Sequence, residues 1–359
     1  MDPGLVTVAG HHFDIDLNTV RELIANGHSV HVYANRRVDD TVVASLGSLV
    51  EVTRLFTPSP YENPQRIDPI AGEAMLYMRH SNLLAQELRR TAPADLWLWP
   101  SLFAPQLSAC ALSGSKIPVS GCVHVDSTPP DQPAGAMWWR HAFLAARNAG
   151  LRLRLGAIEP EHRYGYLPLT TDASFQVFPV PHEGKPIASP KSELRTVGFF
   201  GHQRGEKGSS RIPQLIARLI NDGYRIVSQS SGDQTAVPSH PAVTMLGFVD
   251  VLGDEIAKCD LVVLPYEPSR YRQKGSGILW ESLATGIPVV APYDTAPGRW
   301  IERTGAGTLF IQATAEAIHE AVTRARDDYP RIAEAAWTAS REWPTRHGVA
   351  HFVREMIAL

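Results

Sequence analysis

Short runs of β-branched and other apolar residues alternate along this chain with segments whose apolar residues recur at helical spacing. Residues 261–292 show the pattern most clearly, as an apolar strand (261–264), a polar loop (266–274), a glycine turn (275–277), a helix (278–285) and a second strand (287–290). This order predicts one parallel βαβ unit. The glycine turn leaves backbone N–H groups and the positive end of the helix dipole free to hold an anion, most often a phosphate.

The same alternation fills the rest of the second half of the chain. It predicts strands at 196–200, 225–228 and 243–246, and helices at 212–219, 249–258, 315–326, 332–342 and 349–356. A glycine-rich loop, 201–208, follows the first of these strands. We expect Pro344 to break the helix that precedes it, because proline removes a backbone donor and crowds the previous turn.

The first half has its own βα rhythm. It predicts strands at 5–9, 29–34, 50–55, 96–99, 119–125 and 151–157, and helices at 13–24, 71–90, 104–112 and 134–149. The opening order of strand, glycine turn, helix, glycine and strand is typical of a Rossmann-like half. Because the full G-x-G-x-x-G pattern is missing, the sequence does not favour a nicotinamide or flavin site.

A segment without periodicity separates the two halves. Residues 178–194 carry four prolines and are expected to form a linker. We therefore predict an α/β protein with two Rossmann-like domains that face a central cleft. The predicted domains are residues 1–180, joined by the C-terminal helix at 344–359, and residues 181–343.

Composition narrows the functional classes. The 359 residues are 44% hydrophobic and 20% charged with a net charge of −3, which favours a globular protein and gives no reason to expect nucleic-acid binding. Cys110, Cys122 and Cys259 have no paired spacing, so a disulfide framework and a zinc site are not expected. There is no apolar run near the roughly 20 residues of a membrane helix and no evident signal peptide. We expect a cytoplasmic protein, and leave peripheral membrane contact and oligomeric state open.

Two cations stand in the glycine-rich loop of the second half. Arg204 and Lys207 precede a helix directly, where they would stabilise the charge that develops on a diphosphate leaving group. The alternative is that both are solvated loop charges. The four glycines within the eleven residues 198–208 favour the functional interpretation.

Other candidates are ambiguous when taken singly. Glu281 lies about one turn into the helix after the glycine turn, where it could bind ribose hydroxyls or simply complement the helix dipole. His124 follows a strand at its carboxyl end and could contact substrate or be satisfied by loop backbone. His11 and His12 follow the first predicted strand at the same edge. The Asp14-Ile15-Asp16 motif falls in a first helical turn, where capping explains it better than metal binding.

Two motifs together resemble a known family. GFFGHQRGEKG (198–208) and YRQKGSGILWESLATGIPVVAP (271–292) resemble the donor-site signatures of retaining GT-B glycosyltransferases of the family-four type, also described as group 1. The first motif commonly reads G-R-L-x-x-x-K-G, and Gly201, Lys207 and Gly208 match it in register. Glu281 matches the last glutamate of the E-x7-E motif, whereas the first falls at Gln273.

The resemblance extends over nearly the whole chain, including GHHFDIDLNTVRELIANGHSVHVYA (10–34), VHVDSTPP (123–130) and a terminal helix that crosses back to the first domain. It implies transfer of a sugar from a nucleotide-diphosphate sugar to a glycan, lipid-linked or small-molecule acceptor. The transfer would proceed with retention and without metal or other cofactor, and the leaving phosphate would take the acceptor's proton.

The resemblance also implies roles for single residues. The implied catalytic residues are His124, Gln273 and Lys207. The implied donor-binding residues are Gly10, Arg204, Lys207, Lys274, Gly275, Ser276, Gly277 and Glu281. His11, His12 and Asp126 are placed on the acceptor side.

Gln273 supports a second hypothesis. Glutamine keeps the hydrogen bonds of the family's first glutamate to the donor sugar but lacks its negative charge. The chain could therefore be a catalytically weak or inactive GT-B protein that binds nucleotide sugars. A third hypothesis is another GT-B enzyme, such as a nucleotide-sugar epimerase or a phosphorylase.

Overall fold

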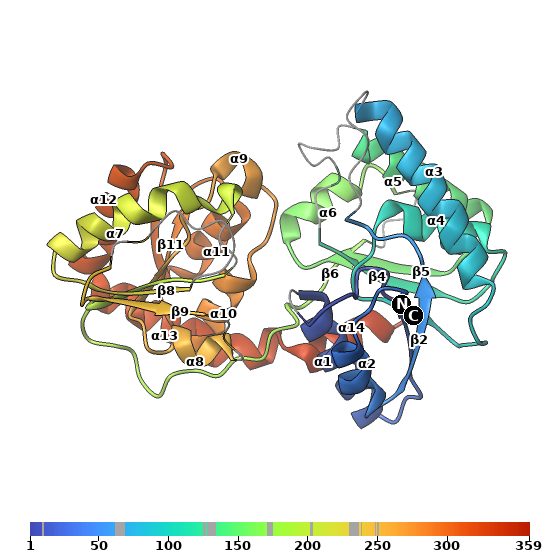
Figure 1. Cartoon of the computed structure of the whole chain (residues 1–359), viewed down its shortest axis with the longest axis horizontal. Coiled ribbons are helices and arrows are strands. Elements are labelled where there is room, and N and C mark those ends of the chain that lie inside the picture. Colours follow the sequence, from blue (N-terminus) through green and yellow to red (C-terminus); the bar gives the residue numbers. More distant parts are fainter. Residues whose placement is uncertain are drawn as a thin grey trace. The chain divides into compact units, whose positions relative to one another are not determined.

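The computed structural model describes residues 1–8, 11–61, 69–124, 127, 134–170, 175–201, 204–229, 237, 239–247, 249 and 251–359. Two compact units make up the chain (Figure 1). The first contains Met1–Pro181 and Val349–Leu359, and the second contains His182–Gly348. The paired strands in both units are parallel, which confirms the predicted α/β class.

The second unit is built on a six-stranded sheet with the order β12-β11-β10-β7-β8-β9. Its strands are β7 (Thr196–Phe199), β8 (Arg225–Gln229), β9 (Val243–Leu246), β10 (Leu261–Val263), β11 (Val289–Pro292) and β12 (Gly307–Phe310). Its helices are α7 (Ile212–Asn221), α8 (Leu252–Ile256), α9 (Pro268–Tyr271), α10 (Gly277–Thr285), α11 (Ala296–Thr304), α12 (Ala315–Asp327) and α13 (Tyr329–Arg346), with short 3-10 turns at Gly205–Lys207 and Ser209–Arg211. Figure 1 shows α7 and α12 on one face of the sheet and α8, α10 and α13 on the other.

The strand order of this sheet contains a switch point. The chain runs outward from β7 through β8 to β9, then returns to β10 on the opposite side of β7 and continues to β11 and β12. The neighbouring strands β7 and β10 therefore flank the switch point, and ligands of open α/β sheets bind at the carboxyl ends of such strands. Both glycine-rich segments identified in the sequence follow these two strands.

The first unit contains two parallel sheets among its described residues, β1-β2 and β3-β4-β5-β6. The strands are β1 (His31–Asn35), β2 (Glu51–Phe56), β3 (Trp97–Trp99), β4 (Val119–Val123), β5 (Leu153–Ala157) and β6 (Gln176–Val177). The helices are α1 (His11–Ala25), α2 (Asp40–Gly47), α3 (Pro69–Leu88), α4 (Ala104–Leu112), α5 (Gly135–Asn148), α6 (Pro160–Tyr166) and α14 (Val349–Ile357). The terminal helix α14 packs on α1 and β4 of this unit, and its Glu355 pairs with Arg154 at 2.6 Å.

The strand predicted at 5–9 does not form over its described residues, 5–8. A tight turn precedes these residues, in which the Asp2 carboxylate accepts a hydrogen bond from the Gly4 amide at 2.6 Å and the Asp2 carbonyl accepts one from the Leu5 amide at 3.3 Å. The bridge to Ala34 of β1 is made by Asp2, ahead of the predicted strand.

Pro344 does not end its helix. Helix α13 continues to Arg346, one residue before His347, whose amide still donates to the Trp343 carbonyl at 2.8 Å. The buried Trp343 holds this last turn, because its indole N–H donates to the His182 carbonyl at 2.8 Å. Tertiary packing outweighs the local cost of the proline.

Several short elements were not predicted from the sequence: α2, α6, α9, α11, β6 and β12. Helix α9 lies inside the stretch that was expected to be a polar loop, and Pro268 occupies its first turn. Helix α11 begins with Ala-Pro-Gly, which hides its helical spacing, and the Thr295 side chain caps it by accepting from the Gly298 amide at 3.0 Å.

Candidate functional site

The loops that follow β7 and β10 approach each other at two glycines. Gly208 has φ of 75°, and a Cβ there would lie 2.0 Å from the Pro265 carbonyl oxygen, so only glycine fits. Gly201, with φ of 86°, turns the chain directly after β7. Its amide donates to Gln229 on the next strand at 2.8 Å. The two loops are therefore held together at the switch point of the sheet.

Lys207 turns back toward the end of β7. Its Nζ lies 3.3 Å from the position that a Cβ on Gly201 would take, and 5.8 Å from the ring centroid of Tyr266. Burial, together with the charges of Arg204 and Lys274, lowers the pKa of Lys207 to about 8, and Glu206 opposes this shift. A bound anion would restore the cationic form, since it supplies the opposite charge that the fold lacks here.

Arg204, Lys207 and Lys274 form a cluster that we call the cation cluster. Arg204 comes from the loop after β7 and Lys274 from the loop after α9. Their side-chain nitrogens lie 3.6 Å and 3.7 Å from the same Glu206 oxygen. The side chains of Arg204 and Lys274 are 50% and 48% exposed, so a ligand in solution can reach them. Arg204 and Lys274 thus share one carboxylate oxygen, and Lys207 is close enough to interact electrostatically with both cations and with Glu206. Such a group of cations suits the oxygens of a diphosphate.

A pair of buried tyrosines supports this cluster. Tyr266 and Tyr271 are stacked with their centroids 4.1 Å apart, and the Lys274 ammonium lies 5.3 Å from the Tyr271 centroid. The hydroxyl of Tyr266 lies 3.1 Å from that of Ser276. Burial raises the pKa of Tyr266 to about 12, so this phenol stays protonated at neutral pH. The tyrosines thus connect two of the cations with the start of α10.

Ser276 is the N-cap of α10. Its hydroxyl oxygen accepts from the Leu279 amide at 3.3 Å, and its own backbone is extended at φ −138°. Gly275 precedes it and Gly277 begins the helix, where the first turn carries no acidic residue. Backbone N–H groups at this end and the helix dipole favour an anion.

Glu281 lies one turn further along α10, and its two carboxylate oxygens lie close to His182 and Gly253. Its Oε2 accepts from Nδ1 of His182 at 3.1 Å. Its Oε1 lies 2.5 Å from the position that a Cβ on Gly253 of α8 would take. Gln273 is partly buried in the loop between α9 and α10, next to Lys274. The second unit thus brings Arg204, Lys207, Lys274, Ser276 and Glu281 into connected loops and the first turns of one helix.

His124 lies in the first unit, directly after β4. Its Nε2 donates to the Pro100 carbonyl at 2.7 Å, because a carbonyl can only accept. Burial and the charge of His12 lower the pKa of His124 to about 4, although the Pro100 carbonyl opposes the shift. The ring is therefore neutral at pH 7 and keeps Nδ1 as a hydrogen-bond acceptor.

His12 forms a buried pair with Asp2. Its Nδ1 lies 2.5 Å from the Asp2 carboxylate, and its Nε2 is hydrogen-bonded to the hydroxyl of Tyr61. Asp16 does not cap α1 as expected, because it lies buried on the second turn of the helix. Burial and the neighbouring Asp2 carboxylate raise the pKa of Asp16 well above its usual value. His12, Asp2 and Asp16 therefore form a polar cluster inside the first unit.

Some predicted site residues cannot be placed in this way. Gly10 and Asp126 lie outside the described residues, and His11 is described only as the first residue of α1. The described part of the chain contains no group of three or more His, Cys, Asp or Glu side chains arranged to hold a metal ion. None of its helices has the length and apolar character needed to cross a membrane.

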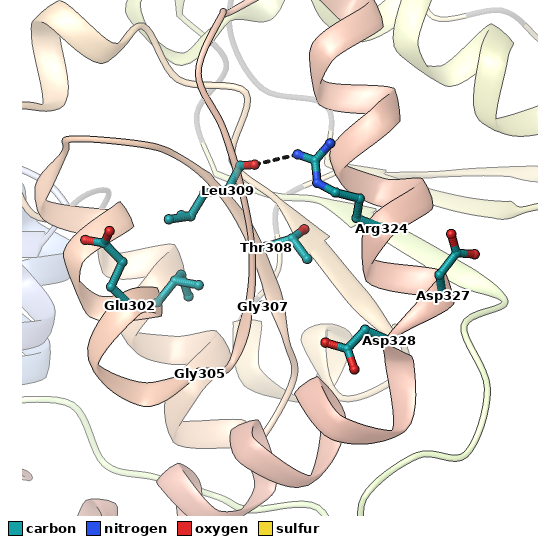
Figure 2. Close-up of a pocket in the computed structure, with 9 residues that line it drawn as sticks. Glu302, Gly305, Gly307, Thr308, Leu309, Arg324, Asp327 and Asp328 are labelled. Atoms are coloured by element: carbon teal, nitrogen blue, oxygen red, sulfur yellow. Dashed lines mark hydrogen bonds between the residues drawn. The ribbon is translucent and has the colours of Figure 1, made fainter.

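A pocket of about 580 Å³ lies elsewhere in the second unit. Figure 2 shows the residues that line it. Its walls come from α11, β12 and α12, and Arg324 on α12 donates to the Leu309 carbonyl at 2.7 Å. Glu302, Asp327 and Asp328 carry acidic groups around it. Because β10 and β11 separate β12 from β7 in the sheet, this cavity is distinct from the cation cluster.

Several residues that shape the candidate site were not singled out in the sequence. These are His182, Glu206, Gly253, Tyr266 and Tyr271. Glu206 and the tyrosines stand within or beside the recognised motifs, so their proximity in sequence was an available signal. His182 lies in the segment without periodicity and Gly253 in a short helix, and neither position carries a local pattern that would mark it.

Residues 195–328, all within the second unit, match the family model described as Glycosyl transferases group 1. This match confirms the family resemblance over that part of the chain. A curated relative, the GDP-mannose:glycolipid 4-beta-D-mannosyltransferase of Xanthomonas campestris pv. campestris, is 26% identical over 152 residues. The matched stretch covers 41% of this chain and 42% of the relative, which is less than half of either protein.

Solved structures match over nearly the whole chain. The Anabaena protein Alr3699/HepE, in complex with UDP and glucose, superposes with a TM-score of 0.65 at 16% identity and covers 99% of this chain and 96% of its own. The glycosyltransferase SnogD from Streptomyces nogalater has a TM-score of 0.62 at 19% identity and covers 98% of this chain and 97% of its own. At these identities the similarity shows the fold, and it confirms the GT-B class predicted from the sequence.

Proposed function

We propose that this protein, whose residues 195–328 match the group 1 glycosyltransferases, transfers a sugar from a nucleotide-diphosphate sugar to an acceptor. The observation that carries the proposal is the cation cluster of Arg204, Lys207 and Lys274 beside the capped start of α10, at the switch point of the sheet. Such a site would bind the diphosphate and stabilise the charge it gains as the glycosidic bond breaks.

The donor would be held along α10. The backbone amides at Gly277 and the cation cluster would bind the phosphates, and the Glu281 carboxylate would accept hydrogen bonds from two ribose hydroxyls. The lowered pKa of Lys207 supports this assignment, because burial and the neighbouring cations disfavour its charged form, which a bound anion would stabilise. Gln273 lies in the loop between α9 and α10 and would contact the donor sugar with its side-chain amide.

The stereochemical course is a separate part of the proposal. Retention follows the family resemblance, and the departing phosphate would then take the acceptor's proton without metal or cofactor. The buried His12–Asp2 pair favours a second candidate, inversion, because an imidazole oriented by a carboxylate is a common general base. The anomeric configuration of the product, measured by NMR against that of the donor, separates the two courses.

The acceptor is proposed to be a lipid-linked sugar. The curated relative acts on a glycolipid by its name. The exposed side of α3 carries Ile70, Met75 and Met78, and α5, joined to it by the stacked Tyr77 and Trp138 rings, has no acidic residue. Exposed apolar side chains, together with the arginines that these two helices carry, favour binding to an anionic lipid surface. The expected cytoplasmic location belongs to this proposal as well.

A binding and turnover assay tests the donor site. Calorimetry with UDP, GDP and ADP should detect binding of one of these nucleoside diphosphates. Incubation with the matching nucleotide sugar should then release that nucleoside diphosphate. Lys207→Ala and Glu281→Ala should each lower the affinity about tenfold or more, since each removes a charge-assisted contact. Lys258→Ala is the matched control, because Lys258 pairs with Glu255 on the surface of the same unit.

The outcomes separate the two functional hypotheses. Full activity of both site variants would contradict the assignment of the donor site. Nucleotide-sugar binding without turnover on any acceptor would instead support the alternative of an inactive binding protein, which Gln273 motivates.

Vesicle binding tests the acceptor part. The protein should sediment with phosphatidylglycerol vesicles more than with phosphatidylcholine vesicles, and Met75→Ser with Met78→Ser should weaken this association several-fold. Met245→Ser is the control, because Met245 is an exposed methionine of the second unit. Equal association of all variants would contradict the proposed lipid surface.

A further inference from the structure

His182 joins the Glu281 carboxylate to the first turn of α10. Its Nδ1 lies 3.1 Å from Glu281 Oε2. Its Nε2 lies 4.0 Å from the position that a Cβ on Gly277 would take. The imidazole thus spans from the carboxylate proposed to bind ribose to the helix start proposed to bind phosphate.

The backbone of His182 is anchored independently of its ring. The His182 carbonyl accepts a hydrogen bond from the indole N–H of Trp343 at 2.8 Å, and Trp343 is a buried residue of α13. The ring itself is 30% exposed and lies with its centroid 5.9 Å from that of Trp280. A substitution of the side chain therefore leaves the anchoring contact in place, and a ligand can reach the ring edge.

The chemistry of the two nitrogens differs. Since a carboxylate only accepts, Nδ1 carries the proton that bonds Glu281, and this bond fixes both the ring orientation and the Glu281 rotamer. Nε2 then remains available on the side of Gly277. Glu281 Oε1 lies close to Gly253 of α8, which has no side chain to displace it. The hydrogen bond from His182 therefore positions the carboxylate before any ligand arrives.

We propose that His182 is a positioning residue of the nucleotide site, which orients Glu281 toward the ribose hydroxyls and presents Nε2 to the ligand at the start of α10. This inference rests on the proposed function, because it requires a nucleotide on α10. It assigns to the site a residue from the segment that precedes the sheet, outside both recognised motifs.

Variants of His182 separate its two nitrogens. Asparagine can place its amide N–H near the Nδ1 position, so His182→Asn should keep the contact with Glu281, whereas His182→Ala removes both contacts. The probes are UDP, GDP and ADP and their 2′-deoxy counterparts, titrated by calorimetry. The readout is the ratio of affinities for the ribo and deoxyribo forms, which a general loss of packing would not change.

We expect the wild type to prefer the ribonucleotide about tenfold, and His182→Ala and Glu281→Ala to reduce that preference to near unity. His182→Asn should restore most of the preference while binding both forms several-fold more weakly than the wild type. His319→Ala is the matched control, because His319 pairs with Asp222 at 2.7 Å elsewhere in the same unit. It should leave the ratio unchanged.

Two results would overturn the inference in distinguishable ways. If the wild type binds a nucleotide and His182→Ala keeps the full ribose preference, His182 has no positioning role although the donor site stands. If the wild type binds none of UDP, GDP and ADP, the proposed function fails and the inference falls with it. Thermal melts of every variant identify any that do not fold, and His182→Asn then supplies the decisive comparison.

Discussion

The ammonium of Lys207 lies 5.8 Å from the ring centroid of Tyr266, and the hydroxyl of the same tyrosine lies 3.1 Å from Ser276. One buried ring thus contacts both the lysine of the loop after β7 and the cap of α10. Neither loop reaches this arrangement alone, because Lys207 and Ser276 are separated along the chain by three strands and the helices between them.

Binding of a nucleotide diphosphate should weaken as the pH rises through about 8. The pKa of Lys207 is lowered to about 8, so its cationic fraction falls from most molecules at pH 7 to few at pH 9. If the ligand requires the cation, its affinity for UDP should fall about tenfold over this range in calorimetric titrations. The unliganded protein should gain stability as the pH rises from about 8 toward the ordinary lysine value of 10.5, because the unfolded chain binds the extra proton there.

Lys207→Arg is the control for this pH dependence. Arginine stays charged over the whole range, so the affinity of this variant should be nearly constant from pH 7 to pH 9. An equally steep decline in Lys207→Arg would mean that another group controls the titration.

Glu206→Gln should strengthen the binding of a diphosphate. The Glu206 carboxylate lies 3.6 Å from Arg204 and 3.7 Å from Lys274, in the place of the anion that the cluster is proposed to bind. These are partly exposed pairs worth less than about 1 kcal/mol each, so removal of the competing charge should tighten UDP binding two- to fivefold at pH 7. Glu267→Gln is the comparison, because Glu267 pairs with Arg211 at 2.5 Å beside the same loops. Weaker binding in Glu206→Gln would show that the carboxylate supports the site.

The sequence predicted the elements that depend on interactions between residues close together in the chain. Strand β7 and helix α10 were predictable, because the spacing of their apolar residues is a local signal. The end of α10 was predictable as well, because Gly286, with φ of 91°, is a typical helix stop. The motifs around Lys207 and Glu281 likewise marked the two loops at the switch point.

Contacts between distant segments were not predictable. The pairing of His182 with Glu281 joins residues 99 positions apart, and nothing in the local sequence of either one requires the other. The turn at Asp2 and the continuation of α13 past Pro344 depend on one side chain and on the packing of Trp343. In α13 a tertiary contact outweighs the propensity of the segment, whereas the turn at Asp2 rests on a hydrogen bond to Gly4, two residues away.

Tyr266→Phe and Ser276→Ala should be coupled in stability. Tyr266→Phe removes the hydroxyl contact, and Ser276→Ala removes both that contact and the cap on Leu279, so each should cost about 1 kcal/mol of unfolding free energy. The double variant should be less destabilised than the sum by about 0.5–1.5 kcal/mol, measured by urea unfolding. Thr295→Ala removes the cap of α11 instead and should be additive with Tyr266→Phe. Additive effects for Tyr266 and Ser276 as well would show that their hydroxyls do not interact.

Gly253→Ala should reduce nucleotide binding without reducing stability. The new methyl group would lie 2.5 Å from Glu281 Oε1, and the carboxylate, as the end of a flexible side chain, would move away. The fold itself should be unaffected or stabilised by up to about 1 kcal/mol, because alanine favours helix α8 over glycine. We expect UDP affinity to fall several-fold in calorimetry, together with the preference for ribose over deoxyribose, while the urea midpoint stays constant or rises. Gly247→Ala has open space around the added methyl group and should change neither quantity. Unchanged ribose preference in Gly253→Ala, with the protein folded, would show that the position of the Glu281 carboxylate does not control recognition of the nucleotide.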